Sequence, residues 1–111
     1  MRFFVTDHER TGSCYYEFYK GRWDGETFWK KDSLFLEDPF LFQAVGFETA
    51  LVECVPGYDP FGETEITCGE WARMGKALAT KDAFSQALYN EAAPWADEVF
   101  TVYGCFTILG L

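Results

Sequence analysis

Few side chains in this sequence are of the types that carry catalysis. His8 is the single histidine among 111 residues, so a histidine general base, a nucleophile–histidine pair or a histidine zinc site must use it or do without one. It stands in the polar run Asp7-His8-Glu9-Arg10 before a turn, which favours a solvated histidine. A hairpin could bring it to Cys14, but closeness in sequence does not supply catalytic geometry. We therefore predict no catalytic residue and a protein that is not an enzyme.

Adjacent carboxylates are the second group that could do chemistry. The pairs Glu37/Asp38 and Asp97/Glu98 are of the kind that flanks a glycosidic bond or binds a hard cation. Asp38 is better explained as a helix cap before Pro39. Adjacent residues on one helix point in different directions, so the second pair would not converge on a ligand. With no glycine-rich phosphate loop in the chain, we predict no cofactor and no metal site.

The charge of the chain is acidic and unevenly distributed. Eighteen Asp and Glu against nine Lys and Arg leave a net charge of −9, and no base occurs from Asp32 to Ala72. This balance argues against nucleic acid and anionic membranes as direct ligands, because phosphate binding needs clustered cations. The base-free stretch either keeps the protein soluble or forms a face that meets a basic partner.

Aromatic residues make up 20% of the chain, more than a core of this size comfortably holds. Some rings must reach the surface, where Tyr and Trp beside carboxylates are typical of binding interfaces. The alternative is that helices cover both faces of the sheet and bury them. The candidate partner-binding residues are Tyr15, Tyr19 and Trp23 from the expected sheet and Tyr58, Asp59, Glu63 and Glu65 from a central loop.

The first third of the chain has strand character. Residues 3–6 are β-prone, and residues 14–20 alternate between two faces. Further strands are expected at residues 26–30 and 33–36. Together these patterns predict an N-terminal antiparallel β-meander.

Helical patterns follow the strands. Asp38-Pro39 predicts the start of a helix that stops at Pro56-Gly57, and an extended piece is expected near residues 65–67. A third helical stretch begins near Lys81. Further along it, Pro94 either kinks this helix or starts another one.

The helix between them has the clearest start signal. Thr67-Cys-Gly-Glu70 has the form of a capping box, which predicts a helix over residues 68–79 with Trp71, Met74 and Leu78 buried. The apolar tail 105–111 is expected to dock on the N-terminal strands. The predicted fold is one α+β domain over residues 1–111: an N-terminal antiparallel β-meander, two to four helices packed on it, and a short C-terminal strand closing the sheet.

The four cysteines lack the paired spacing of zinc or redox motifs. No apolar run is long enough to cross a bilayer, and the first residues turn acidic before a signal-peptide core could develop, which predicts a cytoplasmic protein. Mostly buried free thiols are then expected, and two disulfides in a secreted protein are the alternative. The cysteines are Cys14, Cys54, Cys68 and Cys105.

An aromatic N-terminal meander, the helix start Ile66-Thr67-x-x-Glu70-Trp71 and a closing apolar strand in a small acidic chain resemble the immunity proteins of bacterial polymorphic toxin systems. The resemblance runs loosely from Met1 to Leu111. It implies a stoichiometric inhibitor that occludes a cognate toxin or comparable enzyme. The uncompensated acidic charge adds the expectation that this partner is another protein with a basic surface. Two alternatives stay open: a nucleic-acid mimic that inhibits a DNA-binding protein, and a small-molecule-binding domain or enzyme with an aromatic pocket.

Overall fold

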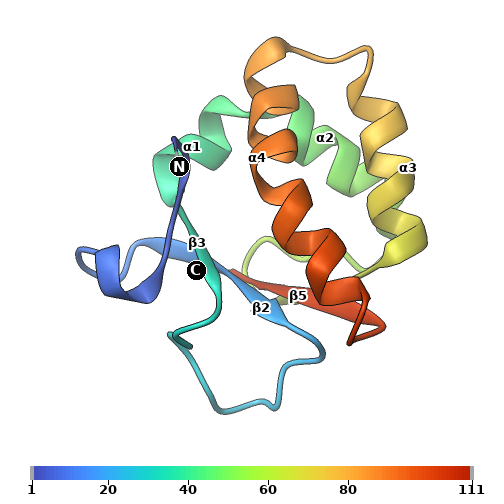
Figure 1. The fold of residues 1–111 in the computed structure, drawn as a ribbon. Coiled ribbons are helices and arrows are strands. Elements are labelled where there is room, and N and C mark those ends of the chain that lie inside the picture. Colours follow the sequence, from blue (N-terminus) through green and yellow to red (C-terminus); the bar gives the residue numbers. More distant parts are fainter. Residues whose placement is uncertain (1, 111) are drawn as a thin grey trace.

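The computed structural model describes residues 2–110, apart from the side chain of Phe42. Five antiparallel strands form one sheet in the order β1-β3-β2-β5-β4, and helices lie against one of its faces (Figure 1). The strands are β1 (Phe4–Val5), β2 (Tyr15–Lys20), β3 (Leu34–Glu37), β4 (Glu63–Thr67) and β5 (Cys105–Leu109). The helices are α1 (Asp38–Gln43), α2 (Val45–Cys54), α3 (Cys68–Leu78) and α4 (Ala83–Phe100), with a 3₁₀ turn at Asp7–Glu9. The predicted α+β class is confirmed.

The N-terminal strands are antiparallel as predicted, but their connections differ from a simple meander. β1 pairs with β3, and β2 pairs with β3 across a loop of residues 21–33. The strand predicted at residues 26–30 is wrong, because that segment is part of this loop. Trp29 there has φ of 61°, which lies outside the β region, and its N–H donates to the side chain of Glu17 instead of to a strand.

The helix predicted from Asp38 to Pro56 is two helices, separated at Ala44. Ala44 has φ −89° and ψ 62°, which is not helical backbone. The break frees the first N–H groups of α2, and two side chains from the start of α4 accept them: Gly46 donates to Asp82 at 3.1 Å and Phe47 to the Ser85 hydroxyl at 2.9 Å. This tertiary cap satisfies donors that a helix start leaves open.

The predicted capping box of α3 is confirmed. The Glu70 N–H donates to the Thr67 hydroxyl at 3.2 Å, and the Thr67 N–H donates to the Glu70 carboxylate at 2.8 Å. The predicted stripe of Trp71, Met74 and Leu78 is buried. These residues are three and four positions apart, so they lie on one side of the helix and face the sheet and the neighbouring helices.

Strand β5 lies inside the sheet, between β2 and β4, so the predicted docking of the C-terminal segment on the N-terminal strands is confirmed. The core lies between this sheet and the helices, where the rings of Phe18 and Phe106 stack at 5.6 Å. Helix α4 crosses above the sheet (Figure 1) and runs through Pro94 without ending there. Its length and its packing on β5 outweigh the backbone hydrogen bond that proline cannot make.

Candidate functional site

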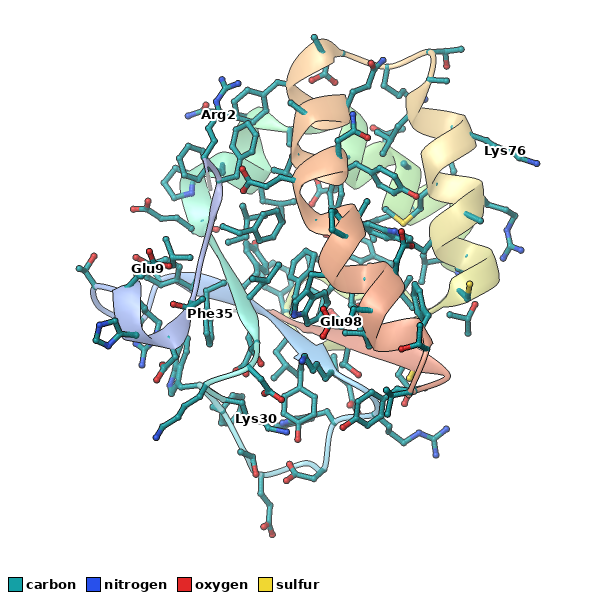
Figure 2. All side chains as sticks on the ribbon, viewed as in Figure 1. Arg2, Glu9, Lys30, Phe35, Lys76 and Glu98 are labelled. Carbon is teal, nitrogen blue, oxygen red and sulfur yellow. The ribbon has the colours of Figure 1, made fainter. Side chains whose placement is uncertain are left out.

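The sheet face opposite the helices is also largely buried. Tyr15, Tyr19 and Phe35 point to this side and are 7%, 5% and 0% exposed. Their cover is the loop of residues 21–33, which lies on the other side of the sheet from the helices (Figure 1). Figure 2 shows Lys30 on this loop and Phe35 on β3, and the Lys30 ammonium lies 4.8 Å from the centroid of the Tyr19 ring. The loop therefore serves as a second, irregular layer.

Glu17 on β2 binds this loop to the sheet. Its carboxylate accepts the N–H of Trp29 at 2.7 Å, the N–H of Lys30 at 3.1 Å and the hydroxyl of Ser33 at 2.7 Å. The residue is 2% exposed, and three donors offset much of the cost of burying its charge. Among residues 2–110, no salt bridge reaches Glu17, so its negative charge lacks a cationic partner.

Trp29 is held in an unfavourable backbone conformation beside Glu17. A bulky residue at φ 61° is strained, and its surroundings hold it there. The Arg10 guanidinium lies 4.0 Å from the centroid of the Trp29 ring, and the Phe35 ring lies at 5.6 Å. Backbone strain of this kind is concentrated at functional sites, so it marks the surroundings of Trp29 as a candidate site.

The tip of the loop is organised by Asp24. Its carboxylate accepts the N–H groups of Glu26 and Thr27 at 2.9 and 2.8 Å and the Thr27 hydroxyl at 2.5 Å. The Thr27 hydroxyl, followed by the backbone donors, lowers the pKa of Asp24 to about 2. The Trp23 indole donates to the Thr27 carbonyl at 2.7 Å and contacts the Phe28 ring at 5.1 Å. Both rings are thereby held at the loop tip.

Two adjoining hollows open between this loop and the ends of β4 and β5. The larger has a volume of about 400 Å³ and is lined by Ser13, Cys14, Tyr15, Glu17, Phe28, Trp29, Leu109 and Gly110. The smaller has a volume of about 130 Å³ and is lined by Trp23, Phe28, Phe61, Gly62, Glu63, Leu109 and Gly110. They share Phe28, Leu109 and Gly110, so together they make one continuous aromatic depression.

Phe61 stands at the rim of the smaller hollow on a well-ordered turn. Its side chain is 83% exposed, yet its N–H donates to the Asp59 carboxylate at 3.0 Å. The Asp59 N–H donates to the Thr64 hydroxyl at 3.0 Å, and the Gly110 N–H donates to the Gly62 carbonyl at 2.7 Å. The turn is thus hydrogen-bonded to both β4 and the C-terminal segment, and it presents the Phe61 ring to solvent.

The structure brings two of the predicted partner-binding residues together. Trp23 and Glu63 line the same hollow, although they are forty residues apart in the sequence. Glu65 is nearby on β4 but forms an ion pair with Arg22 at 3.0 Å, which reduces its availability to a partner. No salt bridge among the described residues reaches Glu63.

The expectation that Tyr15 and Tyr19 lie at the surface is wrong. Both rings are buried, because the 21–33 loop covers their side of the sheet. The Tyr15 hydroxyl accepts the N–H of Thr11 at 3.2 Å, and Tyr19 packs below Lys30. The alternative explanation of the aromatic content, that both sheet faces are covered, therefore holds for these residues, with a loop in place of helices.

Tyr58 and Asp59 have structural contacts that the sequence did not indicate. Tyr58 packs against the core, and its hydroxyl donates to the Glu48 carboxylate at 2.8 Å. Partial burial, followed by this hydrogen bond, raises the pKa of Tyr58. Asp59 shapes the Phe61 turn. Asp59 therefore supports the depression from its edge, Tyr58 belongs to the core side of the sheet, and neither lines the smaller hollow.

The residues missing from the predicted set are Phe28 and Phe61. They are 52% and 83% exposed and line the smaller hollow. Their sequence signal is position: each is a large aromatic residue within a turn segment, such as Asp59-Pro60-Phe61-Gly62, where a chain reversal leaves few neighbours to bury a ring.

The histidine, the possible metal-binding side chains and the cysteines do not gather into a site among the described residues. His8 is exposed in the 3₁₀ turn, and within residues 2–110 no three His, Cys, Asp or Glu side chains are grouped so as to hold a metal ion. All four cysteines are free, as expected. The expectation that they are mostly buried is wrong for Cys14 and Cys68, which are exposed because they lie just before β2 and in the first turn of α3.

Fold and site define a small α+β protein whose single sheet carries helices on one face and a loop-framed aromatic depression on the other. No known protein family matches the sequence, and the searches of curated proteins and of solved structures also found no match. Among the described residues, no helix has the length and apolar character that crossing a membrane requires.

Proposed function

We propose that this protein is a cytoplasmic binding inhibitor that occludes another protein, of the kind represented by bacterial immunity proteins. The contact surface consists of Trp23, Phe28, Phe61 and Glu63, here called the aromatic–acidic surface. The mechanism is steric: bound in one-to-one ratio, the protein covers a functional surface of a toxin or enzyme and performs no reaction on it.

The observation that carries this proposal is the presentation of Phe61. An 83% exposed phenylalanine is costly to leave in water, and here it is held by a turn with hydrogen bonds to Asp59, Thr64 and Gly110. A turn whose backbone is already held in this way loses little conformational freedom on association. Aromatic side chains of this kind are the usual anchors of protein–protein interfaces.

The charge around the anchor indicates the chemistry of the partner. Glu63 lies in the same hollow, and the exposed residues Asp24 and Glu26 are on the adjoining loop. Within the described part of the chain, none of these three carboxylates has a salt-bridge partner. A partner that carries Lys or Arg around an apolar pocket would complement both features. The net charge of −9 would add long-range attraction.

The test combines co-expression with matched variants. The tagged protein is purified together with the products of the neighbouring open reading frames, and the affinity of any stoichiometric complex is measured for the wild type, Phe61→Ala and Glu63→Gln. We expect Phe61→Ala to weaken the complex about tenfold, since a central aromatic anchor contributes on the order of 1–2 kcal/mol or more. Glu63→Gln should reduce the association rate and its dependence on salt.

Val52→Ala is the control. Val52 is 63% exposed on α2, in the helical layer on the other face of the sheet, so its truncation should leave the affinity unchanged. A complex that forms equally well with Phe61→Ala and with wild type would rule out the aromatic–acidic surface as the contact. If none of the neighbouring products binds at low or high salt, the proposal fails for those candidates.

A further inference from the structure

The larger hollow adjoins the aromatic–acidic surface and shares Phe28 with it, but the proposed protein contact does not explain its volume or the rest of its lining. We infer that it is a binding site for a small organic cation, such as a quaternary or alkyl ammonium compound. The inference goes beyond the proposed protein–protein function, because its ligand and its test are different and its lining shares only Phe28 with the aromatic–acidic surface. It rests on the size, the walls and the charge of the hollow.

The hollow is large enough for a ligand. Its volume of about 400 Å³ falls within the range of small-molecule pockets, roughly 300–1,000 Å³. The loop that forms its outer wall is fixed by the three hydrogen bonds to Glu17. The space is thus bounded by a braced segment, and the strained backbone of Trp29 lies in that segment.

The walls are mostly aromatic and apolar. Tyr15 and Trp29 line the inner part, Phe28 stands half-exposed at the opening, and Leu109 of β5 adds an aliphatic side chain. Aromatic rings attract cations through the negative potential of their faces, and groups of rings are a common means of recognising ammonium compounds. Two cations already use rings of this region: Arg10 lies over Trp29, and Lys30 lies over Tyr19.

Charge selects a cation over a neutral or anionic ligand. Glu17 is among the residues that line the hollow and is 2% exposed, and its carboxylate has no salt-bridge partner among the described residues. In a partly desolvated space its field is stronger than it would be in water. Anions are disfavoured by Glu17 and by the net charge of −9, so a monovalent cation with an apolar body is the best match.

The experiment is a titration of the isolated protein with choline, followed by calorimetry and by ¹H–¹⁵N spectra. The comparison compound is 3,3-dimethyl-1-butanol, which has nearly the same shape as choline but no charge. We expect choline to shift the amide signals of Phe28, Trp29 and Leu109 and to bind about tenfold more tightly than the alcohol. Equal binding of both compounds, or no shift with choline at any accessible concentration, would overturn the inference.

Two variants locate the site. Phe28→Ala removes a half-exposed wall of the hollow, so it should fold normally and bind choline about fivefold more weakly. Phe61→Ala removes a ring that lines the smaller hollow alone and should leave choline binding unchanged. The opposite ranking would place the cation elsewhere and overturn the assignment. Phe61→Ala tests binding of the partner protein, and the choline titration tests the cation site. The two proposals can therefore fail independently.

Discussion

At the scale of single residues, several carboxylates serve to hold backbone N–H groups. Glu17, Asp24, Asp82 and Glu91 each accept two or more N–H groups from segments that make few ladder hydrogen bonds. Charge-assisted hydrogen bonds of this type are stronger than neutral ones. These four carboxylates therefore have a structural role, whether or not their charge also attracts a basic partner or ligand.

Asp24 provides a prediction at this scale. Its pKa is lowered from 3.8 to about 2 in the folded protein, so its charge stabilises the loop tip above the unfolded pKa. That contribution disappears as the pH falls through the folded value. We expect a titration of the Asp24 carboxyl signal by NMR to have its midpoint near 2, with the amide signals of Glu26 and Thr27 moving over the same range.

Asp24→Asn is the control for this titration, because an amide keeps an acceptor oxygen but does not ionise. In this variant the amides of Glu26 and Thr27 should stop shifting over that range. A wild-type midpoint close to 3.8, the ordinary value, would mean that the three hydrogen bonds to Asp24 do not form in solution.

At the scale of elements, long-range side-chain contacts decide where segments begin and end. The break between α1 and α2 is stabilised by Asp82 and Ser85 at the start of α4, and a Cβ at Gly46 would clash with the Asp82 carboxylate and the Lys81 side chain. The close approach of these two helix ends therefore requires glycine. Strand β1 has the same kind of support, because Glu91 of α4 accepts the N–H groups of the residues around it.

Glu91→Ala tests this support. The carboxylate accepts the N–H groups of Arg2, Phe3 and Phe4 at 2.5, 2.8 and 2.7 Å, so its loss leaves part-buried donors without partners. We expect the free energy of unfolding to fall by about 1–3 kcal/mol and the amide hydrogens of Phe3 and Phe4 to exchange faster. Glu98→Ala, at an exposed position of the same helix (Figure 2), should change neither quantity. Equal exchange in both variants would contradict the proposed support of β1.

At the scale of the whole molecule, one hydrophobic core stabilises the fold, and no disulfide links the four cysteines. The sheet joins segments from both ends of the chain, since β2 pairs with β5, and this arrangement closes the molecule without a disulfide. All four cysteines are free, and Cys105 lies partly buried at the start of β5, where burial raises the pKa of its thiol. A raised thiol pKa lowers its reactivity near neutral pH.

We therefore expect reducing agent to have no effect on stability. The midpoint of thermal unfolding should be the same with and without dithiothreitol, within about 1 °C, because there is no cross-link whose removal would increase the entropy of the unfolded chain. Counting free thiols with a thiol reagent in denaturant, before reduction, is the control and should give four. A lower midpoint after reduction, with fewer free thiols beforehand, would show that disulfides form.

The sequence by itself was sufficient for features that local physical chemistry decides. Three features were predicted correctly: the capping box at Thr67 and Glu70, the buried stripe of α3 and the apolar C-terminal strand. They depend on hydrogen bonds between near neighbours and on hydrophobic periodicity, which short segments of sequence determine. The fold class followed from the order of these patterns along the chain.

Only the tertiary structure decided the rest. The sequence predicted a strand at residues 26–30 and exposed rings at Tyr15 and Tyr19. In the structure, hydrogen bonds to the Glu17 carboxylate on β2 hold that segment over the sheet, where the loop covers the two rings. Trp23, Phe28, Phe61 and Glu63 likewise come together through the pairing of β5 between β2 and β4. Contacts between residues distant in sequence depend on the whole packing arrangement, and no local pattern encodes them.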